Sequence, residues 1–144
     1  MKRHLLFAAL CATLATTSAF ARDSVAAYPV DAALISEPGK VGSDIALYFA
    51  GQPHAAVVKS LGEFATNKKT NAFGKSDLQA CQHVFLSAVI ELQERARKEG
   101  GNAVINIKSN YKDQLTESAT TFQCGAGAVI AGVALTGDVV TLKK

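Results

Sequence analysis

The sequence SDLQACQHVFLSAVIELQERARKEGG, residues 76–101, decides the fold because it contains the one long helix that the chain predicts. Ser76 and Gln79 form a capping box, in which each side chain accepts a backbone N–H at the start of the helix. Apolar residues then recur at helical spacing and predict one buried stripe: Leu78, Cys81, Phe85, Ala88, Val89, Leu92 and Ala96. Gly100-Gly101 ends the pattern. We therefore predict a helix over 76–99 that lies across a sheet.

Short apolar runs on both sides of this helix predict the strands of that sheet. Two runs precede the helix, 44–50 and 55–66, and Gly62 interrupts the second, which predicts a bulge or a close backbone approach there. Three follow it: 103–109, 117–129 and 131–142, with a turn over 110–115 and a tight connection near 130–132. In the first of these, Ile105 and Ile107 are expected to share one face. The order β-β-α-β-β-β predicts an α+β domain, one long helix on a mainly antiparallel sheet.

Residues 1–21 have the pattern of a secretory signal peptide. Lys2, Arg3 and His4 make a positive start, Leu5–Leu14 is apolar, and Ala19-Phe20-Ala21 is a small-x-small cleavage site. The apolar run is too short to span a bilayer. We expect cleavage near Ala21/Arg22, a periplasmic or secreted mature protein, and no transmembrane segment after the signal is removed.

The mature chain has the size of one domain. Residues 22–43 contain prolines and glycines without periodicity and are expected to form an extended N-terminal arm, followed by a single α+β domain over 44–144. Removing Lys2 and Arg3 leaves 13 of the 15 basic residues against 12 acidic ones, a net charge near +1. No cluster of basic residues indicates nucleic-acid binding. The sequence leaves the oligomeric state open, a homo-oligomer included.

Two of the three cysteines, Cys81 and Cys124, remain after signal removal. In an oxidising compartment two cysteines most simply pair with each other. Because Cys81 lies on the apolar stripe of the helix and Cys124 on the apolar face of a strand, the disulfide would join helix to sheet. A metal-binding or thiol-redox pair is the alternative.

The pattern of histidines and cysteines does not predict a metal site, because two of the four residues point to different sides of the helix. Cys81, His83, Cys124 and His54 offer four zinc ligands by type. However, His83 lies two residues after Cys81, about 200° around the helix axis, so their side chains point to different sides. We expect His83 to face solvent and His54 to lie in a loop, and we predict no metal or other cofactor.

Motifs for catalysis are incomplete. Gly74-Lys75-Ser76 matches the end of a phosphate-binding loop, but the pattern requires a glycine at the position of Lys69. A turn glycine followed by a capping serine explains the same residues. No nucleophile lies beside a base, so we predict a non-enzymatic protein without catalytic residues.

The segment 67–75 is polar and basic, and we expect it to be a loop at one end of the helix. It is the surface that we predict for a partner: Asn67, Lys68, Lys69, Asn71 and Lys75.

Three stretches resemble known proteins: EGGNAVINI (99–107), FQC (122–124) and GVAL (132–135). They are similar to the Rcs outer-membrane stress-sensor lipoprotein, whose periplasmic domain packs a helix on a disulfide-linked sheet, and to the cytoplasmic family labelled heavy-metal-binding. TNKKTNAFGKS (66–76) and Ala80-Cys81 resemble small exported proteobacterial proteins often labelled "excinuclease ATPase subunit". The phosphate-binding loop is incomplete here, so that label is unsupported.

Export, a compact disulfide-linked α+β domain and the lack of a complete catalytic motif together predict a soluble periplasmic module, for binding or for envelope homeostasis or stress, that acts through contacts with an unknown envelope protein. A periplasmic metal-binding or thiol-redox protein that uses Cys81 and Cys124 is the alternative. The stress sensor is lipid-anchored and has two disulfides, whereas this chain has no usable lipoprotein cysteine. Only the Cys81–Cys124 bond could carry over.

Overall fold

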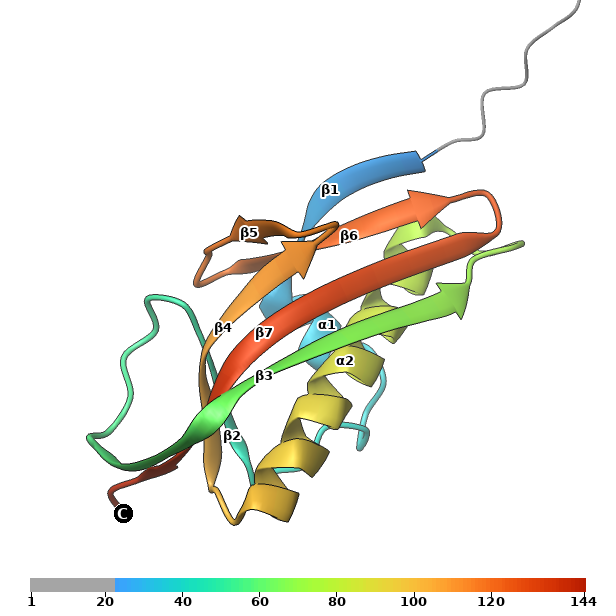
Figure 1. Cartoon of the computed structure of the whole chain (residues 1–144). Helices are drawn as coiled ribbons and strands as arrows, with labels where there is room; N and C mark the ends of the chain where they lie inside the picture. The colour runs from blue at the N-terminus through green and yellow to red at the C-terminus, as the bar shows by residue number, and fades with distance from the viewer. Residues whose placement is uncertain (1–22) are drawn as a thin grey trace, which may run out of the picture.

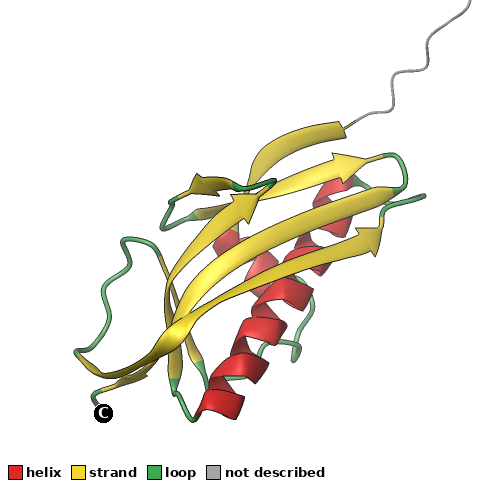
Figure 2. Cartoon of the chain, viewed as in Figure 1, coloured by secondary structure: helices red, strands yellow, loops and turns green. Residues whose placement is uncertain are grey.

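The computed structural model describes residues 23–144, and the signal peptide predicted over 1–21 lies outside the described residues. One long helix crosses one face of a twisted sheet, as Figure 1 shows, and Figure 2 separates helices from strands. The elements in chain order are β1 (Asp23–Pro29), α1 (Val30–Leu34), β2 (Ala46–Phe49), β3 (Val57–Asn71), α2 (Asp77–Glu99), β4 (Ala103–Tyr111), β5 (Gln114–Thr116), β6 (Thr121–Gly127) and β7 (Ile130–Leu142). The predicted α+β architecture is confirmed.

The helix α2 begins and ends where the sequence predicts. Ser76 Oγ accepts the N–H of Gln79 at 3.1 Å, Gln79 Oε1 accepts the N–H of Ser76 at 3.3 Å, and Gly100 ends the helix in the left-handed conformation. Six of the seven predicted stripe residues are buried. Leu78 is 47% exposed, because it lies in the first turn, before the buried residues that begin at Ala80. Neither helix of residues 23–144 has the length and apolar character that crossing a membrane requires.

The core lies between α2 and the sheet. The ring of Phe85 on α2 stacks on Phe122 of β6, with centroids 4.0 Å apart, and on Phe49 of β2 at 5.9 Å. Beside these rings Cys81 and Cys124 form a disulfide with Cα atoms 5.9 Å apart, and neither residue is exposed. The predicted cross-link between helix and sheet is confirmed.

The strand β7 is the centre of the sheet. It pairs antiparallel with β3 along almost its whole length, and on its other side with β4 and, next to the turn, with β6. β1 extends the sheet beyond β6, while β2 pairs parallel with β4. The sheet is therefore mixed and mostly antiparallel, and its chain order contains β1, α1 and β5 in addition to the predicted elements.

The N-terminal segment is part of this domain rather than the separate extended arm predicted over 22–43. All seven residues of β1 pair with β6, and α1 buries Val30 and Ala33 in the core. The following loop is held against α2: Gln93 Nε2 donates to the carbonyls of Gly42 and Ile45. The domain thus begins by Asp23, because main-chain pairing compensates for the weak apolar pattern of the segment.

The strand β3 is longer than predicted. It continues to Asn71, through residues 67–71 that were expected to be loop, and is followed by a short connection to Ser76. Polar residues are compatible with this strand because it lies at the edge of the sheet, where much of it faces solvent. The bulge predicted at Gly62 is confirmed by a register shift there and a φ of 118°.

The strand β4 does not place Ile105 and Ile107 on one face as predicted. Asn106 between them adopts a φ of 54°, and the register with β7 shifts between Ile105 and Lys108. Ile107 therefore joins the main core. Ile105 belongs to a small second cluster with Ala103, Val140 and Leu142.

Two turns differ in position from the prediction. Lys112 and Asp113, both with positive φ, form the turn of a β4–β5 hairpin inside the predicted turn over 110–115. The strand expected from residue 117 begins only at Thr121, and the connection expected near 130–132 lies at Ala128 and Val129. The longer apolar strand over 131–142 is confirmed as β7.

Candidate binding surface

Two connections meet at one end of the sheet and form what we call the apolar tip: Phe73, Val129 and Ile130. Asn71, the last residue of β3, pairs with Ile130, and the N–H of Ala72 donates to the carbonyl of Val129 at 2.7 Å. In Figure 1 the end of β3 and the β6–β7 turn lie at the same end of the molecule. The side chains of the tip are 75%, 57% and 55% exposed. Large apolar residues that cluster in this way on a surface indicate an interaction site.

The tip borders two hollows that share Lys69, Val129 and Ile130. The first has a volume of about 460 Å³ and is also lined by Thr70, Asn71 and Phe73. The second, of about 330 Å³, is also lined by Tyr111 and by residues 127 and 128 at the β6–β7 turn. Each hollow is large enough to receive a side chain of a partner.

Local hydrogen bonds hold Phe73 in its exposed position. Asn71 Oδ1 accepts the N–H of Phe73 at 2.9 Å, and Lys75 Nζ donates to the carbonyl of Asn71 at 3.2 Å. Gly74 next in the chain has a φ of 71°, a conformation that glycine adopts at little cost. The loop is thus fixed by its own sequence, with the ring of Phe73 turned away from the core.

The five residues predicted as a partner surface are divided between two faces. By strand alternation Asn67, Lys69 and Asn71 lie on the face of β3 away from α2. Lys68 lies on the α2 side, where its Nζ is 3.1 Å from a carboxylate oxygen of Glu91. Lys75 follows β3 in the loop. Lys69 and Asn71 line the groove beside the apolar tip, so these two predicted residues adjoin the tip directly.

Lys68 is not a free charge of the surface, because its ammonium group pairs with the carboxylate of Glu91. The hydroxyl of Thr66 donates to the same carboxylate oxygen, and this bond, with Lys68, lowers the pKa of Glu91. Lys69 by contrast forms no ion pair with any carboxylate of residues 23–144. An uncompensated ammonium group therefore stands beside the exposed apolar side chains.

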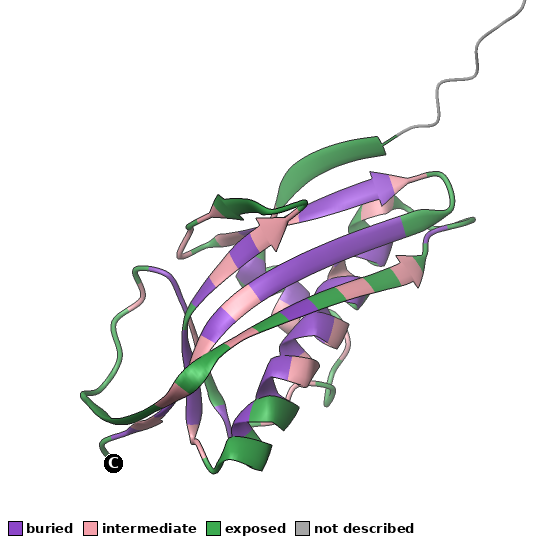
Figure 3. Ribbon diagram, in the orientation of Figure 1, coloured by how far each residue is buried: buried purple, intermediate pink, exposed green. Residues whose placement is uncertain are grey.

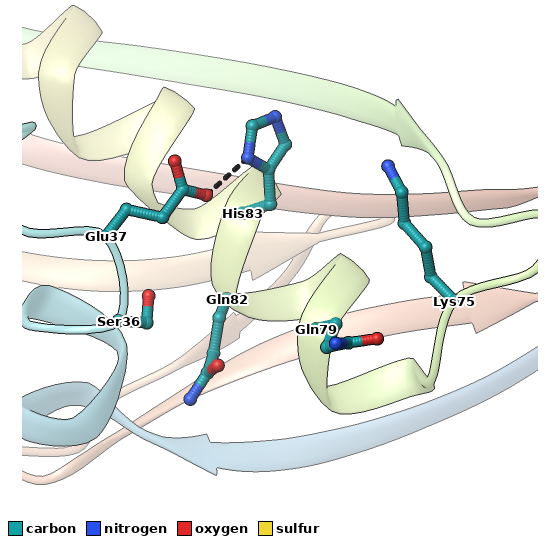
Figure 4. Close-up of a pocket in the computed structure, with 6 residues that line it drawn as sticks. All are labelled: Ser36, Glu37, Lys75, Gln79, Gln82 and His83. Carbon is teal, nitrogen blue, oxygen red and sulfur yellow. Dashed lines mark hydrogen bonds and ion pairs between the residues drawn. The ribbon is translucent and has the colours of Figure 1, made fainter.

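A polar hollow of about 320 Å³ lies between the α1–β2 loop and the first turns of α2 (Figure 4). Its main interaction is a hydrogen bond between His83 Nδ1 and Glu37 Oε1 at 2.5 Å, and both side chains are partly exposed. In Figure 4 Lys75 and His83 point to one side of the helix while Gln82 points to the other. The polar groups do not converge on one point, so the hollow has no evident ligand position.

The residues considered for a metal site do not come together. The sulfur atoms of Cys81 and Cys124 are bonded to each other in the core, whereas His83 is exposed on α2. His54 lies in a loop, where its ring packs at 5.6 Å from that of Tyr48. Within residues 23–144 no group of three or more His, Cys, Asp or Glu side chains is placed to hold a metal ion.

No protein-family model matches the chain, and no curated protein matches it. The resemblance to the Rcs stress sensor and to the exported proteobacterial proteins stays a prediction.

The sequence analysis missed the three residues of the apolar tip. Phe73 lies inside the predicted segment 67–75 but was not among the residues named for it, although its position between polar residues and before Gly74 was a usable signal. Val129 and Ile130 belong to a continuous apolar run over 124–135, which is typical of buried strands. Nothing local distinguishes Val129 and Ile130 from the buried members of that run.

Proposed function

We propose that this chain is an exported, non-enzymatic binding module of the bacterial periplasm that acts through protein contacts made by the apolar tip. The observation that carries the proposal is the exposure of Phe73, Val129 and Ile130 around a groove at one end of an otherwise well-packed domain. Such a group exposed to water is unfavourable unless a partner covers it. A role in envelope homeostasis or stress is the setting that the sequence resemblance suggests.

The charges around the tip indicate the chemistry of the partner segment. Lys69 stands beside the groove without a carboxylate partner among residues 23–144, and Lys75 lies in the loop after Phe73. A segment that carries an apolar side chain next to an aspartate or glutamate would fill the groove and pair with Lys69.

The alternative, a metal-binding or thiol-redox protein, depends on access to Cys81 and Cys124. Thiol exchange requires a thiolate to reach a sulfur atom, and both sulfurs are buried in the core. This burial supports a structural role for the disulfide and favours the binding module over the alternative.

Photo-crosslinking in the periplasm tests the proposal. A photoreactive phenylalanine analogue is placed at position 73, and in a matched control at Val58, which is also exposed, 67% by area, but lies at the start of β3. We expect an adduct with one envelope protein from position 73 and not from position 58. The captured protein, once purified, should bind the wild type and lose at least tenfold in affinity for Phe73→Ser, but not for Val58→Ser.

A second experiment, with lipid vesicles, tests whether the apolar tip binds lipid instead of a protein. The purified protein is sedimented with vesicles of anionic phospholipid, such as phosphatidylglycerol, and with neutral vesicles. The proposal predicts no sedimentation with either. Binding to anionic vesicles that Phe73→Ser abolishes, without a protein adduct at position 73, would instead make the tip a lipid-binding site and contradict the proposal.

A further inference from the structure

The outer edge of β1 is open. Among residues 23–144, β1 pairs only with β6, and it is the outermost strand on its side of the sheet in Figure 1. Figure 3 shows it as exposed along its length. An open edge presents a row of backbone N–H and C=O groups that can pair with another strand.

The register identifies which groups point outward. The N–H of Val30, directly after β1, donates at 2.9 Å to the carbonyl of Thr120, the residue opposite it when the β1–β6 register is continued. Opposite residues of an antiparallel pair alternate between hydrogen-bonded and non-hydrogen-bonded. The even-numbered residues of β1 therefore bond to β6. Asp23, Val25 and Ala27 direct their N–H and C=O groups away from the sheet.

This edge has few of the features that normally prevent pairing, and its one proline, Pro29, lies at the very end of the strand. Natural edge strands are protected by lysines, prolines, bulges or short length. The seven pairs of β1 with β6 are in unbroken register, and residues 24–28 carry no charge. β3, the other long edge, has the bulge at Gly62 and lysines at 59, 68 and 69. The contrast indicates that β1 is suited to pair.

We propose that β1 pairs antiparallel with β1 of a second copy of this chain, about a two-fold axis at Ala26. In this register the outward groups of Val25 and Ala27 bond to those of Ala27 and Val25 in the other copy. Asp23 lies opposite Pro29 at each end of the pairing. Proline has no N–H, and the carbonyl of Pro29, the N-cap of α1, already accepts the first bond of that helix. The bonds between the two copies are therefore those of Val25 and Ala27.

The side chains of β1 suit a second copy. The pairing places Val25 opposite Ala27 and Ala26 opposite itself, so the centre contains small apolar side chains and no like charges. The only charged residue of the strand, Asp23, lies at its end and forms an ion pair with Lys112 at 2.7 Å. A symmetric contact of this kind uses one surface on both copies and closes as a dimer. It also covers Val25, which is half exposed.

Light scattering coupled to gel filtration tests the dimer with the mature protein, residues 22–144, from micromolar to millimolar concentration. We expect a dimer whose dissociation constant rises at least tenfold in Ala27→Pro. This change removes an outward N–H and places a ring toward the second copy, while bonds to β6 come from the even-numbered residues. Proline is accepted on an edge strand when the lost N–H faces solvent.

Two further variants keep the test decisive. Ala55→Pro makes the same chemical change in an exposed loop and should stay dimeric. Val25→Lys alters only an exposed side chain, so it folds even if Ala27→Pro does not, and it should also raise the dissociation constant of the dimer at least tenfold. A monomeric wild type over the whole range, or a dimer that neither Ala27→Pro nor Val25→Lys weakens, would overturn the proposal. Phe73→Ser should leave the dimer intact, because the apolar tip is a different surface.

Discussion

Ala72 donates its N–H to the carbonyl of Val129 at 2.7 Å, and this bond joins the loop before α2 to the turn between β6 and β7. The two segments are 57 residues apart in sequence and become neighbours because β3 and β7 pair along almost their whole length. The side chain of Ala72 is buried, whereas Phe73 and Val129 beside it are exposed. One main-chain contact thus anchors the apolar tip to the core.

Gly137→Ala should destabilise the protein more than Gly125→Ala. A Cβ at Gly137 would lie 2.6 Å from Val104 Cγ1, between α2 and the sheet, where overpacking costs about 1–3 kcal/mol. At Gly125 the Cβ would meet only the outer atoms of the Tyr111 ring, which can move toward solvent. Urea unfolding of both variants measures the difference. Equal losses of unfolding free energy would contradict this prediction and would show that the Tyr111 ring does not move aside.

Replacing both Cys81 and Cys124 with alanine should lower the free energy of unfolding by about 4 kcal/mol, because the bond closes a long loop in the unfolded chain. The two residues are 43 positions apart in sequence. Urea unfolding of the variant and of the wild type under oxidising conditions measures the loss. Alkylation of the native wild type by iodoacetamide before reduction would contradict a buried structural disulfide.

The ion pair of Asp44 with Arg97 should make stability depend on acid. Two bonds of 2.6 and 2.7 Å from Arg97 hold the pKa of Asp44 at about 2, below its ordinary value of 3.8. A lowered pKa in the folded state stabilises the fold above the ordinary value and loses this contribution as the pH falls toward the folded value. The wild type should therefore lose stability between these two pH values.

The variant Asp44→Asn separates this contribution from others. It should be less stable than the wild type at neutral pH and approach it near the folded pKa of Asp44. Glu91, whose pKa is also lowered, keeps part of the acid dependence in both proteins. Urea midpoints measured across the acid range give the comparison, with Asp31→Asn on α1 as the control. A constant difference between Asp44→Asn and the wild type at every pH would refute the assignment.

Lys69→Glu should weaken binding of the partner by about tenfold at low salt, because it reverses the charge beside the groove. The difference should shrink as ionic strength rises, since salt screens an exposed charge. Lys68→Glu makes the same reversal where the charge already pairs with Glu91 and should affect binding less. Equal losses for the two variants would place the charge recognition elsewhere.

The sequence predicts best the features that local chemistry determines. The capping box at Ser76, the glycine at the end of α2 and the bulge at Gly62 each depend on residues next to one another, and all three are present. The disulfide follows from the pattern as well, because both cysteines occupy apolar positions of their elements. Together with the apolar stripe of the helix and the apolar runs around it, these features predict the α+β fold.

The sequence predicts poorly what depends on distant pairing. β1 is a strand because β6 is beside it, and residues 67–71 are a strand because β7 continues past them. The positive φ of Asn106 has no signal in the alternating pattern around it, so the faces of Ile105 and Ile107 were predicted wrongly. The apolar tip was missed for the same reason: the exposure of Val129 and Ile130 follows from where the β6–β7 turn projects.

The claim that the apolar tip binds the partner is tested most directly by affinity. The partner captured at position 73 is titrated against three proteins: the wild type, Phe73→Ser and Val58→Ser. Isothermal titration with the purified partner gives each dissociation constant, and urea unfolding checks that both variants keep their stability. If the apolar tip is the binding surface, Phe73→Ser should lose at least tenfold in affinity for the partner, and Val58→Ser should bind it as the wild type does. Equal affinity of all three proteins would contradict the claim that the apolar tip is the binding surface.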